Sequence, residues 1–174
     1  GASITKAITK GSKNLLGVGA PVGAPTVKNR LPHRRLSILA TAARLGIPVT
    51  SHVAIGTDII HMHPKADGGA IGDCSLRDFR TLTAVVATLG DGVYLNFGSA
   101  VVLPEVFLKA VSLARNLGNP VQKLTTVNLD FLQHYRPLTN VVNRPTLGSG
   151  KGYNLTGHME IMVPLLFAAV LEEL

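Results

Sequence analysis

Three residues in the first half of this chain have the types and spacing of a metal site. His61 and His63 lie two residues apart, so both imidazoles would project from one face of an extended segment, as metal-binding pairs do. Asp58 can supply an oxygen ligand or orient one imidazole. One hypothesis is therefore a metal-dependent hydrolase that uses these three residues, with His52 or His134 completing the shell. The alternative is that the histidines are structural and hydrogen-bonded.

A second pattern predicts a site for a negatively charged ligand. The β-prone run Val93–Phe97 leads into the small residues Gly98-Ser99-Ala100, and Pro104 then opens a helical stretch, Glu105 to Leu117. The first N–H groups of a helix lack partners and its dipole is positive at that end, so phosphate groups bind there. The alternative is an ordinary connection between a strand and a helix, with no ligand.

The polar segment from Asp130 to Gly157 holds the remaining candidate residues. Its cationic side chains suit an anionic ligand or a ligand with carbonyl groups; they are His134, Arg136, Arg144 and Lys151. A desolvated Lys151 can also act as an amine nucleophile. The run Gly148–Gly152 resembles a phosphate-binding loop, but it lacks the glycine spacing and the Ser or Thr of a P-loop. A flexible surface loop is the alternative for this run.

Composition limits the class of protein that carries these residues. A chain of 174 residues is long enough for one well-buried domain, and 46% hydrophobic with 5% aromatic residues suits a layered α/β protein. No apolar run reaches membrane-spanning length. Lysines interrupt any signal-peptide pattern at the N-terminus, and the single cysteine, Cys74, fits a reducing compartment. We therefore expect a cytoplasmic protein that does not enter a membrane.

The net charge of +7 arises from the first part of the chain. Seven basic and no acidic residues precede position 36: Lys6, Lys10, Lys13, Lys28, Arg30, Arg34 and Arg35. This segment has no interleaved aromatic residues, so a nucleic-acid partner is not expected. A contact with another subunit or with acidic ligands fits better. We divide the chain into a basic, Gly/Pro-containing arm (1–30) and a folded α/β domain (31–174).

The pattern of apolar residues and turn residues predicts the elements of that domain. They are a helix from Leu31 to Leu45 closed by Gly46, a strand Ile47–Ile55, a helix from Ser75 to about Leu89, the strand Val93–Phe97, the helix after Pro104, a strand Leu124–Leu129 and a helix Ile161–Leu174. Strands joined by helices of this length favour a parallel sheet with helical crossovers. Ligands bind such sheets beyond the carboxyl ends of the strands, where we expect the segments 55–73, 98–104 and 130–157 to converge.

The order of these segments resembles the deoxyhypusine synthase family. Four short matches carry the resemblance: Ile47-Pro48-Val49 followed by Thr57-Asp58, Gly98-Ser99-Ala100-Val101-Val102, Arg144-Pro145 followed by Gly150-Lys151, and Val163-Pro164-Leu165-Leu166. The matches span residues 31–174. The chain departs from the family where Leu103-Pro104-Glu105 replaces the Lys-His-His that follows the glycine turn.

The resemblance implies a Rossmann-like fold, bound NAD and a tetrameric assembly. The family transfers a butylamine group from spermidine to a lysine of a translation factor. By this resemblance Lys151 matches the catalytic lysine, Asp58 contacts a polyamine, and Gly98, Ser99 and Ala100 hold NAD.

The leading hypothesis is thus an NAD-type nucleotide-binding protein of this superfamily, with an amine-transferring activity. Its catalytic residues would be Lys151, Asp58 and His134, and its cofactor-binding residues Gly98, Ser99, Ala100, Arg144 and His158. Two alternatives stay open: the metal-dependent hydrolase, and a non-catalytic subunit of a homo-oligomer whose basic arm packs on a neighbour.

Overall fold

The computed structural model describes residues 33–174, so the basic arm expected at 1–30 lies outside the described part. The chain divides into two compact units, residues 1–82 and residues 83–174, and the boundary falls within helix α4 (Gly68–Ala87). The residues predicted as metal ligands, Asp58, His61 and His63, belong to unit 1. The predicted anion site belongs to unit 2.

In unit 1, helix α3 (Ile38–Leu45) follows the short 3-10 helix η1 (Arg34–Leu36). The Ser37 side chain caps α3, and Gly46 ends it with a left-handed φ of 71°, which confirms the predicted stop. The expected strand Ile47–Ile55 is wrong, because no ladder forms there. A strand needs a neighbour for its backbone groups, whereas the Ser51 N–H donates to the Asp78 carboxylate at 2.9 Å.

Helix α4 begins seven residues before Ser75, the predicted cap, which lies inside the helix. The cap is Asp67, whose Oδ1 accepts a hydrogen bond from the Ala70 N–H at 3.0 Å. The short 3-10 helix η2 (Ile59–Met62) lies between α3 and α4 in the chain. A small core forms around the buried residues Ala70, Ile71 and Cys74.

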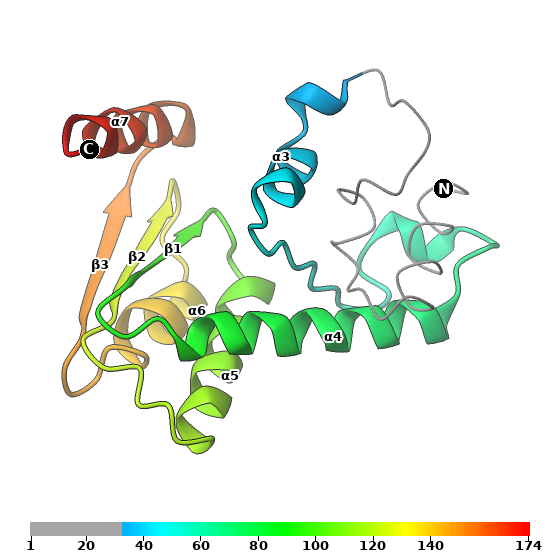
Figure 1. Ribbon diagram of the computed structural model, residues 1–174, viewed down its shortest axis with the longest axis horizontal. Helices are drawn as coiled ribbons and strands as arrows, with labels where there is room; N and C mark the ends of the chain where they lie inside the picture. Colours follow the sequence, from blue (N-terminus) through cyan, green and yellow to red (C-terminus); the bar gives the residue numbers. More distant parts are fainter. Residues whose placement is uncertain (1–32) are drawn as a thin grey trace. The chain divides into compact units, whose positions relative to one another are not determined.

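Unit 2 is built on three parallel strands in the order β1 (Val93–Phe97), β2 (Thr125–Asp130) and β3 (Lys151–Thr156), seen as adjacent arrows in Figure 1. Strands β1 and β2 confirm the prediction to within a residue, whereas β3 was not predicted. The connections are helix α5 (Val102–Asn116), the short helix α6 (Tyr135–Pro137) and the π-helix η3 (Leu138–Asn143). The α/β class and the parallel sheet are confirmed, and they are compatible with a Rossmann-like fold.

One face of this sheet is covered by α5 and η3. The Tyr94 ring of β1 stacks on the Phe107 ring of α5, with centroids 3.5 Å apart and planes 6° from parallel. A Cβ at Gly152 of β3 would collide with the backbone oxygen of Val142 in η3. Because the strands pair Tyr94 with Thr126 and Thr126 with Gly152, these contacts define a single face.

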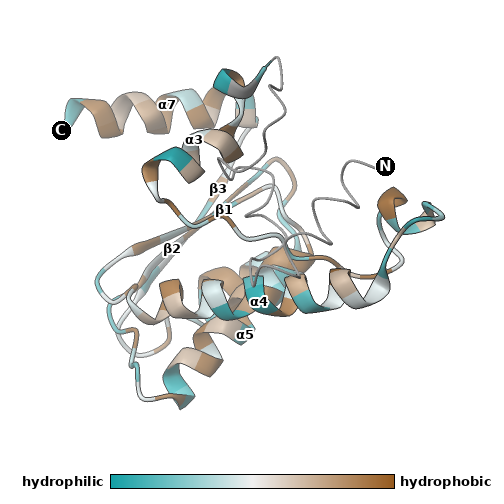
Figure 2. Cartoon of the chain, turned by 45° about the vertical axis from the view of Figure 1, so that its right-hand side comes forward, coloured by the Kyte–Doolittle hydropathy of each residue, from teal (hydrophilic) through white to brown (hydrophobic). Residues whose placement is uncertain are grey.

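The opposite face carries apolar side chains that remain accessible: Val93, Phe97, Tyr153 and Leu155 are each 41–56% exposed. Beyond β3, helix α7 (Met159–Glu172) has no buried residue, and Figure 2 shows it largely brown, the colour of hydrophobic residues. None of the helices in residues 33–174 has the length and hydropathy needed to span a membrane.

Candidate functional site

The carboxyl ends of the three strands meet at one edge of the sheet, and hydrogen bonds hold the following segments side by side. The Gly98 N–H donates to Leu129 O at 3.0 Å, and the Gly157 N–H donates to Asp130 O at 3.3 Å. The Gln133 amide donates to Leu155 O at 3.0 Å. We call this edge, with residues 98–101, 131–136 and 157–158, the rim.

Directly inside the rim, three asparagines form a ladder across the strands. Asn96, Asn128 and Asn154 are in register, and all three lie on the face covered by α5 and η3. Asn96 Nδ2 donates to Asn128 Oδ1 at 2.7 Å, and Asn128 Nδ2 donates to Asn154 Oδ1 at 2.9 Å. Asn128 Nδ2 also donates to Gln133 Oε1 at 2.8 Å, which connects the ladder to the rim.

Sequence reasoning missed this ladder, although a signal for it was present. Each strand carries an asparagine at its fourth residue, as the runs Val93-Tyr94-Leu95-Asn96, Thr125-Thr126-Val127-Asn128 and Lys151-Gly152-Tyr153-Asn154 show. Asparagine is disfavoured in strands, so its recurrence at one position in three short segments is informative. The third segment was not recognised as a strand, which hid the pattern.

The turn after β1 has an open backbone. Gly98 adopts a φ of 62°, and a Cβ there would have no atom within 4 Å. Ser99 connects the turn to both neighbouring elements. Its carbonyl accepts from Asn96 Nδ2 of β1 at 3.0 Å, and its hydroxyl accepts from the Leu103 N–H of α5 at 3.3 Å. Helix α5 begins at Val102, two residues before Pro104. A ligand can therefore approach the Cα of Gly98, whereas the Gly98 N–H is already used by Leu129 O and one N–H of the helix start by Ser99.

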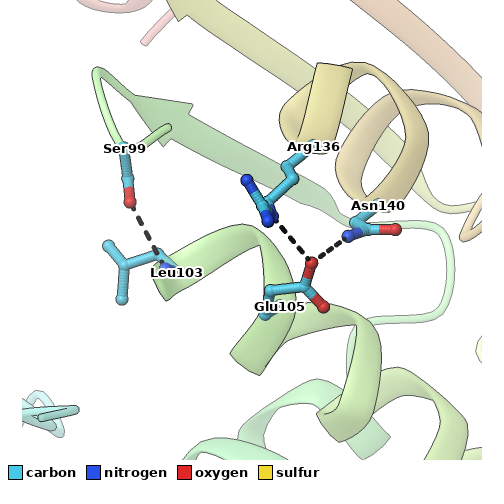
Figure 3. A network of polar contacts seen from close by, with 5 residues as sticks. All are labelled: Ser99, Leu103, Glu105, Arg136 and Asn140. Atoms are coloured by element: carbon cyan, nitrogen blue, oxygen red, sulfur yellow. Dashed lines mark hydrogen bonds and ion pairs between the residues drawn. The ribbon is translucent and has the colours of Figure 1, made fainter. Parts of the chain in front are cut away.

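A polar cluster adjoins the start of α5 (Figure 3). The Glu105 carboxylate accepts a hydrogen bond from Asn140 Nδ2 at 2.8 Å and lies 3.6 Å from Arg136 Nε. The Arg136 side chain is 55% exposed, so it remains accessible to a ligand from solvent. Asn140 lies in η3, and π-helical turns are frequent at functional sites.

Two of the predicted histidines lie at the rim. His134 is exposed at the N-cap position of α6, directly after Gln133. His158 is exposed at the N-cap position of α7 and stacks on Phe131, with ring centroids 4.5 Å apart. The rim thus brings together Gly98, Ser99, Ala100, His134 and His158 from the predicted set.

Two other predicted residues lie away from the rim, and the expectation that they join it is wrong. Lys151 is the first residue of β3, at the amino end, about 16 Å along the strand from the rim. Arg144 follows η3, and the next residue, Pro145, accepts a hydrogen bond from Arg115 at the far end of α5 at 2.6 Å. The glycines near Lys151 serve packing, since a Cβ at Gly150 would lie 2.5 Å from Leu124 O.

In unit 1 the predicted metal residues form a helix cap. Asp58 Oδ1 accepts from the Ile60 N–H at 3.2 Å, while His61 Nδ1 accepts from the N–H groups of Gly56 at 3.0 Å and Asp58 at 3.4 Å. His63 Nδ1 accepts from the Lys65 N–H at 3.2 Å. In the described part of the chain, no group of three or more His, Cys, Asp or Glu side chains is arranged to hold a metal ion.

His52, the other histidine considered for a metal shell, hydrogen-bonds to Thr50 Oγ1 at 2.9 Å. Burial lowers the pKa of His52, and the negative charge of Asp78 opposes part of that effect. The hydrogen bond to Thr50 and the partly buried position are those of a structural histidine, so the histidines described here give no support to the hydrolase hypothesis.

Comparison of the chain with protein-family models, with curated proteins and with solved structures found no match. The resemblance to the deoxyhypusine synthase family therefore stays a prediction.

Proposed function

We propose that the rim of unit 2 binds a phosphate-bearing nucleotide of the NAD type. The observation that carries this proposal is the turn between β1 and α5, where the absence of a side chain at Gly98 leaves open space at the carboxyl end of a parallel sheet. Nucleotide phosphates bind at this place in parallel α/β sheets, because a helix begins there and glycine permits a close approach.

The charges around the turn support an anionic ligand. The exposed side chains of His134, Arg136 and His158 all belong to the segments that follow the strands. Arginine binds phosphate through charge-assisted hydrogen bonds, and the positive end of the α5 dipole adds to the attraction. Glu105 acts against it, and its ion pair with Arg136 offsets part of its charge.

Isothermal titration of the whole chain with NAD and with inorganic pyrophosphate tests the proposal. We expect both ligands to bind, and Arg136→Gln to weaken both about tenfold, because a charge-assisted hydrogen bond is lost. Arg44→Gln, which removes an exposed arginine from α3 of unit 1, is the matched control and should leave both affinities unchanged. If neither ligand binds to the wild type at millimolar concentration, the proposal is overturned.

The proposal is limited to ligand binding. An amine transfer of the kind that the family resemblance implies needs a lysine beside the cofactor. Lys151 lies at the opposite end of β3. Asp58, the predicted polyamine contact, is the N-cap of η2 in unit 1.

A second candidate, a subunit of a homo-oligomer, is favoured by α7. A helix that is apolar all round is normally buried, yet Ile161, Leu165, Phe167 and Leu171 are each more than 50% exposed. Self-association through α7 would cover them. Sedimentation equilibrium of wild type and Phe167→Ser tests this candidate, with the equally exposed Leu132→Ser as control. We expect an oligomer that only Phe167→Ser dissociates; a monomeric wild type would contradict it.

A further inference from the structure

We propose that the Asn96 carboxamide oxygen is a specificity site for a hydroxyl group of the ligand, of the kind that a ribose carries. This inference rests on the proposed function, because it adds a second contact to the phosphate site at the Gly98 turn. It assigns the Asn96–Asn128–Asn154 ladder a role in recognition.

The orientation of the Asn96 amide follows from its partners. Nδ2 donates one hydrogen bond to Ser99 O at 3.0 Å and a second to Asn128 Oδ1 at 2.7 Å. Ser99 O is a backbone carbonyl and can only accept, so exchanging the nitrogen and the oxygen of Asn96 would place two acceptors against each other. The oxygen is therefore the free end, and the bond to Ser99 O places the carboxamide directly beneath the turn.

That oxygen is buried and has no partner. Asn96 is 1% exposed, and its Oδ1 receives no hydrogen bond within the part of the chain that the structure describes. Buried polar atoms are nearly always paired, and a bound group or water is one explanation of an exception. An acceptor in this position requires a hydrogen-bond donor from a ligand or from water.

The hydrogen bonds of the ladder run in one direction, which begins at the Asn96 carboxamide. Asn96 donates to Asn128, and Asn128 donates in turn to Asn154. A donor bound to Asn96 Oδ1 would polarise the Asn96 amide and strengthen the bonds that follow, as hydrogen-bond chains do. Ligand binding would thereby tighten the pairing of side chains across all three strands.

The chemistry of the ladder selects a neutral donor. Its members and Gln133 carry no charge, and Asn96 and Asn128 are buried. Burying an ammonium group there without a carboxylate would be strongly unfavourable, whereas a hydroxyl group requires only the acceptor. In a nucleotide whose phosphate lies at the Gly98 turn, the ribose hydroxyls are donors of this class.

Titrations with three probes test the inference: inorganic pyrophosphate, adenosine 5′-monophosphate and its 2′,3′-dideoxy analogue. We expect the wild type to bind the monophosphate about tenfold more tightly than the dideoxy analogue, since an unpaired buried acceptor remains with the latter. Asn96→Leu should abolish that preference. Asn116→Leu, at an exposed position at the end of α5 and outside the ladder, is the control and should retain it.

A measurement on the wild type covers the case in which Asn96→Leu fails to fold. In ¹⁵N-labelled protein, the side-chain amide resonance of Asn96 should shift with the monophosphate and not with the dideoxy analogue. Equal affinity for the two nucleotides, or equal shifts, would overturn the inference and assign the oxygen to a bound water. In that case binding of pyrophosphate would still uphold the proposed function, whereas failure of all three probes to bind would overturn both.

Discussion

The Tyr94 ring lies flat against the Phe107 ring, with centroids 3.5 Å apart, and this stack joins β1 to α5. Tyr94 precedes Asn96 by two residues in β1, so both side chains lie on the same face of the sheet. Burial at this place raises the pKa of Tyr94 to about 12. The packing of α5 on β1, which positions the candidate site, can therefore be followed through the pKa of Tyr94.

The free energy of unfolding should fall at alkaline pH because of Tyr94. The folded-state pKa of Tyr94 lies above the ordinary value of 10.0, so folding favours the neutral phenol. Its contribution to the free energy of unfolding is present below pH 10 and is lost as the pH rises towards 12, by roughly 2–3 kcal/mol. Urea unfolding of wild type and Tyr94→Phe between pH 9 and 12 measures this loss. The free energy of unfolding should fall more steeply with pH in the wild type than in the variant. Identical slopes would contradict it; Tyr153→Phe, on the exposed face, is the control.

Phe107→Ala should lower the free energy of unfolding by about 3–5 kcal/mol. Phe107 is 0% exposed and provides the surface on which Tyr94 stacks, so its removal leaves a cavity under the sheet. Phe131→Ala, at a side chain 57% exposed, should cost less than about 1 kcal/mol. Equal losses in chemical denaturation would show that α5 does not cover β1 as described.

Asn128→Leu should destabilise unit 2 by about 2–3 kcal/mol. The change leaves Gln133 Oε1 and Asn154 Oδ1 without the partner described for them, and it removes one of the two acceptors of Asn96 Nδ2. Asn116→Ala, at the exposed end of α5, is the control and should change stability by less than about 0.5 kcal/mol. A neutral effect of Asn128→Leu on the urea midpoint would rule out a cooperative ladder.

Two glycine substitutions should act in opposite directions. Gly152→Ala places a Cβ against the Val142 backbone oxygen, which has no flexible end to move, so we expect a loss of about 2–4 kcal/mol. Gly72→Ala, inside α4 with no atom within 4 Å of the new Cβ, should gain about 0.5–1 kcal/mol. Thermal unfolding of both variants checks the signs, and a stable Gly152→Ala protein would disprove the close packing of η3 on β3.

Glu105→Gln should raise the affinity for pyrophosphate a few-fold. The substitution removes a negative charge from the first turn of α5 and releases Arg136 from its ion pair, while the side-chain oxygen can still accept from Asn140. Titration at low and high salt measures the effect, which should shrink at high salt because exposed charges are screened. An unchanged affinity at low salt would place the anion site away from α5.

Local patterns in the sequence were sufficient where an element depends on neighbouring residues. Gly46 ends α3, the run Val93–Phe97 is a strand, and the small residues 98–100 form the turn before α5, because capping, alternation and turn chemistry act over a few residues. The α/β class followed from the same patterns. The predicted strand Ile47–Ile55 failed because β-branched residues favour an extended chain but do not supply a hydrogen-bonding neighbour.

The tertiary structure alone decided which side chains share a site. Lys151 and His158 are seven residues apart in the sequence, yet β3 places them at opposite ends of the sheet. Asn96, Asn128 and Asn154 are far apart in the sequence, and only the register of three parallel strands aligns their amides. Residue type and spacing determined the local conformations, whereas strand pairing, which joins distant segments through the backbone, determined the site.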